Sequence, residues 1–248
     1  MTYAFAALRD EYTRLWLSMK PLDGDRAELN AIATKLYKNI GRYQKVESAT
    51  KVPASVIAVI HNRESDADFA THLHNGDSLK RRTFHVPAGR PVIGDPPFTW
   101  EESAVDALRL DGLSLAGKWT VEQALFMLEG YNGWGYRQYH PETDSPYLWA
   151  GTNIQDPGKY VADGKFNRSA FDTQLGCAPL LGALWTLDPS LSLPMEGARP
   201  APRPEAPEIS LEPPVLPEPA IPWPDIPDDP PKPTIYESIA ARLRRLFS

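Results

Sequence analysis

Proline is concentrated in one stretch of this chain, and that stretch divides the sequence into parts. Fifteen of the 26 prolines lie between Pro194 and Pro233. Because proline lacks a backbone N–H and has a fixed φ, a segment this rich in proline cannot form helices or central strands and is expected to be extended. We therefore predict a folded domain over residues 1–190, an extended linker over residues 191–233, and a separate short segment over residues 234–248.

The composition is that of a globular protein with one substantial core. The chain has 248 residues, of which 42% are hydrophobic and 23% charged, with a formal net charge of −6. This charge provides no basic surface for duplex nucleic acid, so no nucleic-acid partner is predicted. The single cysteine, Cys177, cannot form a disulfide within the chain and lies in the apolar run QLGCAPLLGALW. It is expected to be a core residue.

The N-terminal sequence, MTYAFAALRDEYTRLW, has early charges and no long apolar region, unlike a signal peptide. No stretch of the sequence is apolar over the length that a membrane span needs. We therefore expect the protein to be cytoplasmic when made, so that any action outside the cytoplasm would follow release or export.

Apolar residues recur at helical spacing, which predicts a mostly α-helical domain. Residues 1–20 and 25–47 are expected to form N-terminal helices packing on the rest of the domain, the second with a break or bend at Gly41. Capping boxes, which mark helix starts, occur at Thr99-x-x-Glu102, Thr120-x-x-Gln123 and Thr234-x-x-Glu237.

Towards the end of the domain, two further elements are expected. The segment 171–185 is predicted to be the last core helix, in two pieces if Pro179 interrupts it. The sequence GKYVADGKF is predicted to form a short turn or a pair of strands. The long segment 65–98 has little periodicity and is expected to be an irregular loop, a feature that is often functional in a compact domain.

A carboxylate ends the helix that is predicted to begin near Val52. Val56, Ile60 and Glu64 are four residues apart, so they share one helix face. A glutamate that continues a buried stripe is partly removed from water, which raises its pKa and suits it to act as a general acid. The alternative is that Glu64 is simply the first polar residue at a frayed helix end.

Three more carboxylates follow Glu64 within fifteen residues, so a catalytic pair is a second hypothesis. Glycoside hydrolysis commonly uses two carboxylates that flank the scissile bond. Asp66 and Asp68 are equally suited to capping or turn roles, and Asp77, in the turn NGD, is a weak candidate for activating water.

Aromatic and amide side chains gather in two later segments that are rich in glycine and proline. Sugar rings are held by flat aromatic side chains together with polar groups that bind the hydroxyls. The alternative is that these rings close the edge of the core with their polar atoms in water. The candidates are Tyr131, Asn132, Trp134, Tyr136, Tyr147, Trp149 and Asn153.

Four histidines suggest a metal site, but their spacing in the sequence does not favour one. His61, His72, His74 and His85 lie close together in the sequence, but the HExxH pattern of a zinc protease is absent. Hydrogen bonding within turns is the preferred interpretation for His72 and His74. The phosphate-binding, dinucleotide-binding and serine-hydrolase motifs are also absent, so neither a metal nor a cofactor is predicted.

Several of these segments together resemble a known superfamily. The pair Glu64-Ser65 after a helix, followed much later by Tyr131-Asn132-Gly133 at another helix end, resembles the lysozyme-like superfamily, in particular its goose-type lysozyme and lytic-transglycosylase branch. The stretches IHNRESDADFATHLHNGDSL, RTFHVPAGRP, LEGYNGWGYR, SPYLWAGTN and GKYVADGKF resemble peptidoglycan-cleaving proteins of endolysin type. The resemblance covers roughly residues 50–185.

The resemblance implies a two-lobed, mostly helical fold with long loops around a glycan cleft, and peptidoglycan as the partner. It places the catalytic acid on Glu64, an orienting neighbour on Ser65, and cleft residues on Tyr131 and Asn132. The expected activity is a muramidase that cleaves the β-1,4 bond between N-acetylmuramic acid and N-acetylglucosamine. The usual Gly-Leu-Met-Gln stretch after the acid is missing, so hydrolysis and transglycosylation to a 1,6-anhydro sugar both stay open, as does a non-catalytic wall-binding or virion-structural role.

The segment 234–248, TIYESIAARLRRLFS, is predicted to be a basic amphipathic helix. Its apolar residues share one face and its arginines lie toward the other. Such a helix is suited to contact an anionic membrane or a lipopolysaccharide surface. The alternatives are a docking helix for a partner or a helix that folds back onto the domain.

Overall fold

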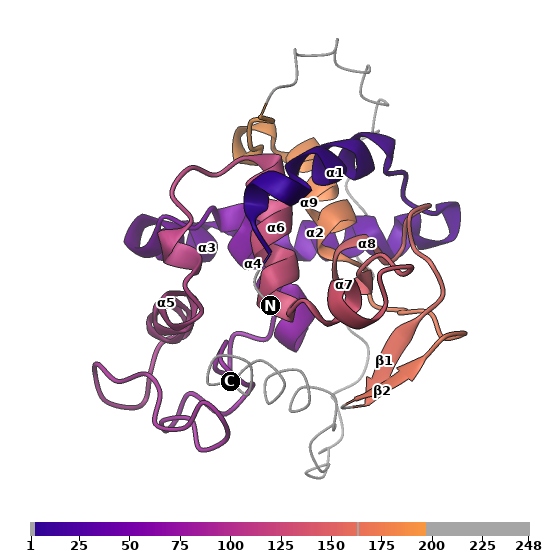
Figure 1. Cartoon of the computed structure of the whole chain (residues 1–248). Coiled ribbons are helices and arrows are strands. Elements are labelled where there is room, and N and C mark those ends of the chain that lie inside the picture. Colours follow the sequence, from indigo (N-terminus) through magenta and orange to yellow (C-terminus); the bar gives the residue numbers. More distant parts are fainter. Residues whose placement is uncertain (1–2, 163, 197–248) are drawn as a thin grey trace, which may run out of the picture.

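Helix α4 (Ala54–Ser65) lies at the centre of the fold, as the computed structural model shows (Figure 1). The structure describes residues 3–162 and 164–196. All residues from 54 to 62 are buried, because α6 (Val121–Asn132), α9 (Cys177–Leu187) and α3 (Ile40–Thr50) pack against different sides of α4. A helix that is apolar all round is stable only when it is enclosed in this way. The confirmed class is therefore mostly α.

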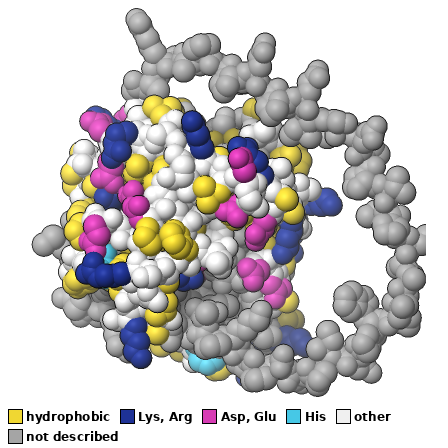
Figure 2. Space-filling view, turned by 90° about the vertical axis from the view of Figure 1, so that its right-hand side faces the viewer, with side chains coloured by type: hydrophobic (Ala, Val, Ile, Leu, Met, Phe, Trp, Pro, Cys, Tyr) yellow, Lys and Arg dark blue, Asp and Glu magenta, His cyan; other side chains and the backbone are white. Residues whose placement is uncertain are grey.

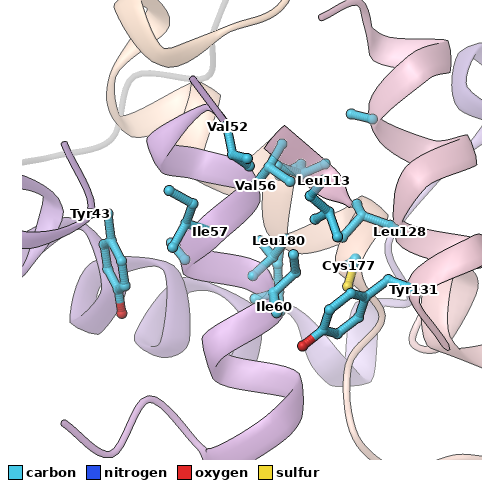
Figure 3. Close-up of a cluster of buried hydrophobic side chains, with 14 of the residues drawn as sticks. Tyr43, Val52, Val56, Ile57, Ile60, Leu113, Leu128, Tyr131, Cys177 and Leu180 are labelled. Carbon is cyan, nitrogen blue, oxygen red and sulfur yellow. The ribbon is translucent and has the colours of Figure 1, made fainter. Parts of the chain in front are cut away.

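Side chains from these central helices interlock in one buried cluster (Figure 3). Val56 and Ile60 of α4 face Leu128 of α6 and Leu180 of α9. Cys177 lies within the same cluster and is fully buried, which confirms the prediction that it is a core residue.

The remaining helices cover this centre. Helix α1 (Phe5–Ser18) packs on α6, α2 (Arg26–Lys38) on α9, and α5 (Trp100–Leu110) on α3 (Figure 1). The short helices are α7 (Gly135–Tyr139) and α8 (Pro146–Trp149). Single 3-10 turns span Asp23–Asp25, Leu113–Leu115 and Pro189–Leu191.

One antiparallel hairpin completes the described residues. Strands β1 (Lys159–Ala162) and β2 (Lys165–Asn167) pair Lys159 with Asn167 and Tyr160 with Phe166. This confirms the strand pair predicted from GKYVADGKF.

The predicted helix over residues 25–47 is two helices, and the break is not at Gly41. The chain leaves α2 at Asn39, whose φ of −106° and ψ of 11° are not helical. The Asn39 side chain donates to the Lys35 carbonyl, so it competes with the backbone for a helical acceptor. Gly41 lies inside the first turn of α3. Within α2, Leu36 is buried whereas the neighbouring Tyr37 is exposed.

The last core helix begins at Cys177, six residues later than predicted, and Pro179 does not divide it. Pro179 is the third residue of α9, where a backbone N–H has no acceptor within the helix. The preceding Gly176 lets the chain pass close to α8, since a Cβ at this position would lie 2.3 Å from the Leu148 carbonyl oxygen.

Capping at two predicted helix starts is present in the structure. Thr99 and Glu102 form a complete capping box at α5. The Thr120 hydroxyl accepts from the backbone N–H of Gln123 at the start of α6. The third predicted box, at Thr234, lies outside the described residues.

The folded domain extends past residue 190. Residues 191–196, which the proline count placed in the linker, pack on the domain through Leu193 and Met195. The Pro194 carbonyl accepts from the backbone N–H of Val121 at 3.0 Å, and the Glu122 carboxylate accepts from the backbone N–H of Glu196 at 3.1 Å. The rest of the predicted linker and the predicted helix over residues 234–248 lie outside the described residues.

The surface carries charges of both signs. On the face seen in Figure 2, acidic and basic side chains are interspersed with apolar ones. Within residues 3–162 and 164–196, no helix has both the length and the apolar character needed to cross a membrane.

His61, in α4, is a buried titratable group held in its neutral form. Its Nε2 donates to the Asp68 carbonyl at 3.0 Å, so Nδ1 is the acceptor for the Tyr43 hydroxyl at 3.1 Å. The ring packs on Trp100 with 4.4 Å between ring centroids. Burial among these aromatic rings lowers the pKa of His61 from 6.5 to about 4.

The protein is expected to lose stability on mild acidification. The unfolded chain binds a proton at His61 near pH 6.5, but the folded chain does so only near pH 4, so the free energy of unfolding falls by about 3 kcal/mol across this window. His72, whose pKa burial also lowers, adds a loss of the same sign. Urea unfolding at several pH values measures the slope, and His61→Gln should flatten it. An unchanged slope in that variant would place the titrating group elsewhere.

Candidate functional site

Glu64 lies in the last turn of α4, at a helix end that is closed. Asp66 follows in the left-handed conformation, with φ of 52°, and its N–H donates to the Asn62 carbonyl. The next N–H, of Ala67, donates to the His61 carbonyl at 3.2 Å. These bonds satisfy the terminal carbonyls of α4 and fix the position from which Glu64 projects. The frayed-end alternative is therefore not favoured.

The Glu64 carboxylate is half-buried and contacts α8. The Tyr147 hydroxyl donates to Glu64 Oε1 at 3.1 Å. Tyr147 is itself 4% exposed, so its ring is fixed in the core and only its hydroxyl edge approaches Glu64. The neighbouring Ser65 is turned back onto its own helix, where its hydroxyl donates to the His61 carbonyl at 3.2 Å.

An ion pair beside Glu64 holds this arrangement in place. Arg63 Nη2 lies 3.0 Å from Asp172 Oδ2, and each of the two side chains is only 8% exposed. The Arg63 guanidinium lies 4.9 Å from the centroid of the Tyr147 ring and also donates to the Gln174 carbonyl at 2.8 Å. Arg63 therefore joins α4 to α8 and to the segment that precedes α9.

Asp172 keeps its charge in this environment. Burial alone raises the pKa of Asp172, but the charges of Arg63 and Lys159 and their hydrogen bonds outweigh burial and lower it. Lys159 Nζ lies 2.9 Å from Asp172 Oδ1. The pair is thus ionised on both sides, and its carboxylate oxygens are occupied by cations of the same chain.

Tyr131 and Asn132 come from the C-terminal end of α6, which packs on α4. Tyr131 is 6% exposed, and Figure 3 shows its ring near Cys177 with the hydroxyl directed toward α4. Asn132 is half-buried and is the last residue of α6, because Gly133 turns the chain with φ of 96°. Near its C-terminal end, α6 therefore lies close to α4.

Trp149 and Asn153 are not arranged around Glu64. Trp149 is 1% exposed and belongs to the core, so its faces are unavailable to a sugar. Asn153 is exposed and binds the end of α1, where its Oδ1 accepts from the Lys20 N–H at 2.6 Å and its Nδ2 donates to the Ser18 carbonyl. Trp149 therefore serves the core, which is the alternative to sugar binding given above. Asn153 serves a structural role, because it connects its own loop to the chain at the end of α1.

Asp77 holds the 65–98 loop together. It is 3% exposed, and its Oδ2 accepts from the backbone N–H groups of Phe84 and His85 at 2.9 and 3.0 Å. Its Oδ1 lies 2.7 Å from His85 Nδ1. Although burial raises the pKa of Asp77, the bonds from His85 and Phe84 lower it overall. The contacts of this carboxylate are those of a structural residue.

The histidines make hydrogen bonds within the fold. His72 Nδ1 lies 2.8 Å from the Ser103 hydroxyl, and His74 Nε2 lies 2.7 Å from Asp106 Oδ2. Within the described ranges, no group of three or more His, Cys, Asp or Glu side chains is placed to hold a metal ion.

Three charged side chains that the structure buries, those of Arg63, Asp172 and Glu129, are not among the predicted site residues. Arg63 and Asp172 are 109 positions apart, and nothing in their local patterns indicates that they meet. Glu129 is 2% exposed in α6, where the Tyr12 hydroxyl donates to it at 2.7 Å and Arg137 Nε lies 2.8 Å away. Its burial raises its pKa. Glu129 follows Leu125 by four positions, so it continues an apolar helix face in the same way as Glu64 does. The sequence pattern that indicates Glu64 therefore also indicates Glu129.

A surface pocket of about 300 Å³ lies near the hairpin. It is lined by Glu142, Thr143, Asp156, Pro157, Phe166 and Arg168. None of the predicted site residues lines this pocket.

Neither a protein-family model, nor a curated protein, nor a solved structure matches this chain. The candidate site is therefore defined by its own residues: Glu64, the Tyr147 hydroxyl that donates to it, and the buried Arg63–Asp172 pair that contacts the Tyr147 ring.

Proposed function

We propose that the protein cleaves the glycan strands of peptidoglycan as an endolysin-like muramidase, with Glu64 as the general acid. The observation that carries the proposal is the half-buried Glu64 carboxyl at the closed end of α4, hydrogen-bonded by Tyr147. In this proposal the domain is a two-lobed, lysozyme-like fold whose glycan cleft runs past Glu64. Asn132 and the edge of Tyr131 lie at that cleft, and Ser65 keeps the helix end in shape.

In the proposed reaction, Glu64 donates a proton to the glycosidic oxygen between N-acetylmuramic acid and N-acetylglucosamine. Proton transfer to the leaving oxygen lets the C1–O bond break without expelling an alkoxide. Tyr147 and Arg63 contribute by fixing where the carboxyl points, because a general acid acts only within hydrogen-bond reach of the oxygen. Water then adds to C1 and gives its proton to the Glu64 carboxylate, which restores the acid, and the product is a reducing sugar.

The lytic transglycosylase alternative is favoured by one observation. Two other candidates for a second carboxylate, Asp77 and Asp172, are buried and already bind groups of the protein. A reaction in which the sugar's own 6-hydroxyl attacks C1 needs no second carboxylate to activate water, and it gives a 1,6-anhydro product.

Digestion of purified peptidoglycan separates these outcomes. Mass spectrometry of the released muropeptides should show reducing sugars, each heavier by one water than the corresponding anhydro sugar. Anhydro products would replace the muramidase proposal with the transglycosylase. Binding to the wall without any release of muropeptides would overturn both and support the non-catalytic role.

Tyr147→Phe is expected to lower kcat roughly tenfold with little change in KM, because a hydrogen bond to a charged group contributes about 1.5 kcal/mol or more. The phenyl ring keeps its place against Arg63, so the fold should be retained. Initial rates of reducing-end release measure the effect. Tyr139→Phe, at a tyrosine that is 59% exposed, is the matched control and should act like wild type. A Tyr147→Phe protein with wild-type kcat would remove Tyr147 from the site.

A further inference from the structure

The loop between α4 and α5 displays large apolar side chains to solvent. It lies outside the helices at the lower left of Figure 1. Phe84, Val86, Val92 and Ile93 are 51%, 53%, 60% and 79% exposed. Residues 80–95, named the 80–95 loop here, therefore hold four exposed apolar side chains within ten positions. Such a concentration usually marks an interaction surface.

The charge of the 80–95 loop is opposite to that of the chain. It contains Lys80, Arg81, Arg82 and Arg90 against a single acid, Asp95, whereas the whole chain has a net charge of −6. Lys80 and Arg81 are exposed, and the Arg81 guanidinium lies 4.2 Å from the centroid of the Phe84 ring. Cations thus lie directly beside the apolar side chains.

The 80–95 loop is held in shape by its own hydrogen bonds. The Thr83 N–H donates to the Arg90 carbonyl at 2.8 Å, and Arg90 forms two hydrogen bonds to Asp106 of α5 at 2.7 and 2.8 Å. Arg82 donates to the Pro91 and Gly94 carbonyls. These hydrogen bonds fix the backbone of the 80–95 loop and keep its apolar side chains exposed. A partner can therefore bind without a further entropy cost for ordering the loop backbone.

We propose that the 80–95 loop docks the domain on an anionic phospholipid bilayer. Exposed apolar side chains can enter the boundary between headgroups and acyl chains, while neighbouring Lys and Arg side chains bind the lipid phosphates. A second copy of the chain fits less well, because two such loops would bring like charges together. This proposal is independent of the proposed enzymatic activity and of any role of residues 234–248.

Co-sedimentation of the full chain with vesicles tests the surface. Binding is expected with vesicles that contain phosphatidylglycerol and not with phosphatidylcholine alone, and it should weaken as salt is raised. Lys80→Gln should weaken vesicle binding about fivefold, from the usual contribution of one cation near an anionic surface. Ile93→Ser should weaken it about tenfold through lost apolar burial.

The chain offers a matched control surface. Leu115 is 84% exposed and Lys118 is exposed three positions later, so Leu115→Ser and Lys118→Gln remove the same chemistry elsewhere. Both control variants should bind vesicles like wild type. Equal binding by the loop variants and the controls would overturn the proposal, since the bilayer contact would then lie in another part of the chain.

A labelled cysteine gives a direct readout of insertion. Cys177 is buried, so a polarity-sensitive dye will attach selectively to Ile93→Cys or to the control Leu115→Cys in the folded protein. Adding anionic vesicles should shift the emission of the dye at position 93 to the blue and leave position 115 unchanged. No shift at position 93 would overturn the proposal. Loss of binding to purified cell wall in Ile93→Ser, with vesicle binding intact, would assign the loop to a wall polymer instead.

Discussion

Glu64→Gln is expected to lower the rate of peptidoglycan cleavage on the order of 10²–10⁴-fold while the fold is retained. Glutamine has the shape of the protonated acid and can still accept the hydrogen bond from Tyr147, which is 3.1 Å long in the native protein. What it lacks is a proton to give to the glycosidic oxygen. The loss should therefore appear in kcat rather than in binding to the wall, and muropeptide release with a parallel wall-binding assay measures both.

Asp66→Asn is the matched control for this experiment. Asp66 is an exposed carboxylate two positions after Glu64, and it holds the left-handed position at which asparagine is also well tolerated. Neutralising it changes the local charge as much as Glu64→Gln does, but it should leave cleavage near the wild-type rate. Near wild-type cleavage by Glu64→Gln would remove Glu64 as the acid. Equal losses of cleavage rate in both variants would show that the negative charge at this helix end matters, and not proton donation by Glu64.

The largest effect on stability is expected from Asp172→Ala, which should lower the free energy of unfolding by about 3–5 kcal/mol. Arg63 would then be a buried cation without its carboxylate, since the side chain is only 8% exposed in the native protein. The other cation at this carboxylate, Lys159, is 34% exposed and can turn to water. Urea unfolding followed by circular dichroism measures the change.

The double variant Arg63→Met with Asp172→Leu separates the pair from the site it occupies. Replacing both charges with apolar side chains leaves no unpaired cation, so it should recover much of the stability that Asp172→Ala loses. If the pair also fixes Tyr147 and Glu64, this double variant should remain less active than wild type even when it is stable. A loss below 1 kcal/mol for Asp172→Ala would show that solvent or the neighbouring carbonyl groups compensate Arg63.

The elements that depend on local sequence could be predicted. The capping box at Thr99 and the cap at Thr120 mark their helices because each is complete within four residues. The strand pair follows from a turn that is equally local. The break at Asn39 was misplaced because a glycine lowers helix propensity without ending a helix, whereas a side-chain bond to the Lys35 carbonyl competes with it directly.

The candidate site could be predicted only in part. The position of Glu64 at the end of the helix that carries Val56 and Ile60 could be predicted, because helical spacing fixes it. Its partner Tyr147 is 83 positions away, and the Arg63–Asp172 ion pair spans 109 positions, so tertiary packing alone decides these contacts. Composition marked Trp149 and Asn153 as sugar ligands, but aromatic and amide groups serve a core or a loop equally well.

The burial of α4 has a consequence for how the site moves. The helix that ends at Glu64 is also the most enclosed segment of the fold, with residues 54–62 all buried. Its amide hydrogens should exchange with solvent only when the whole domain opens, because α3, α6 and α9 enclose the helix. The carboxyl at its end is therefore attached to the most persistent part of the molecule, and any movement around this carboxyl has to come from the loops and helices that approach it.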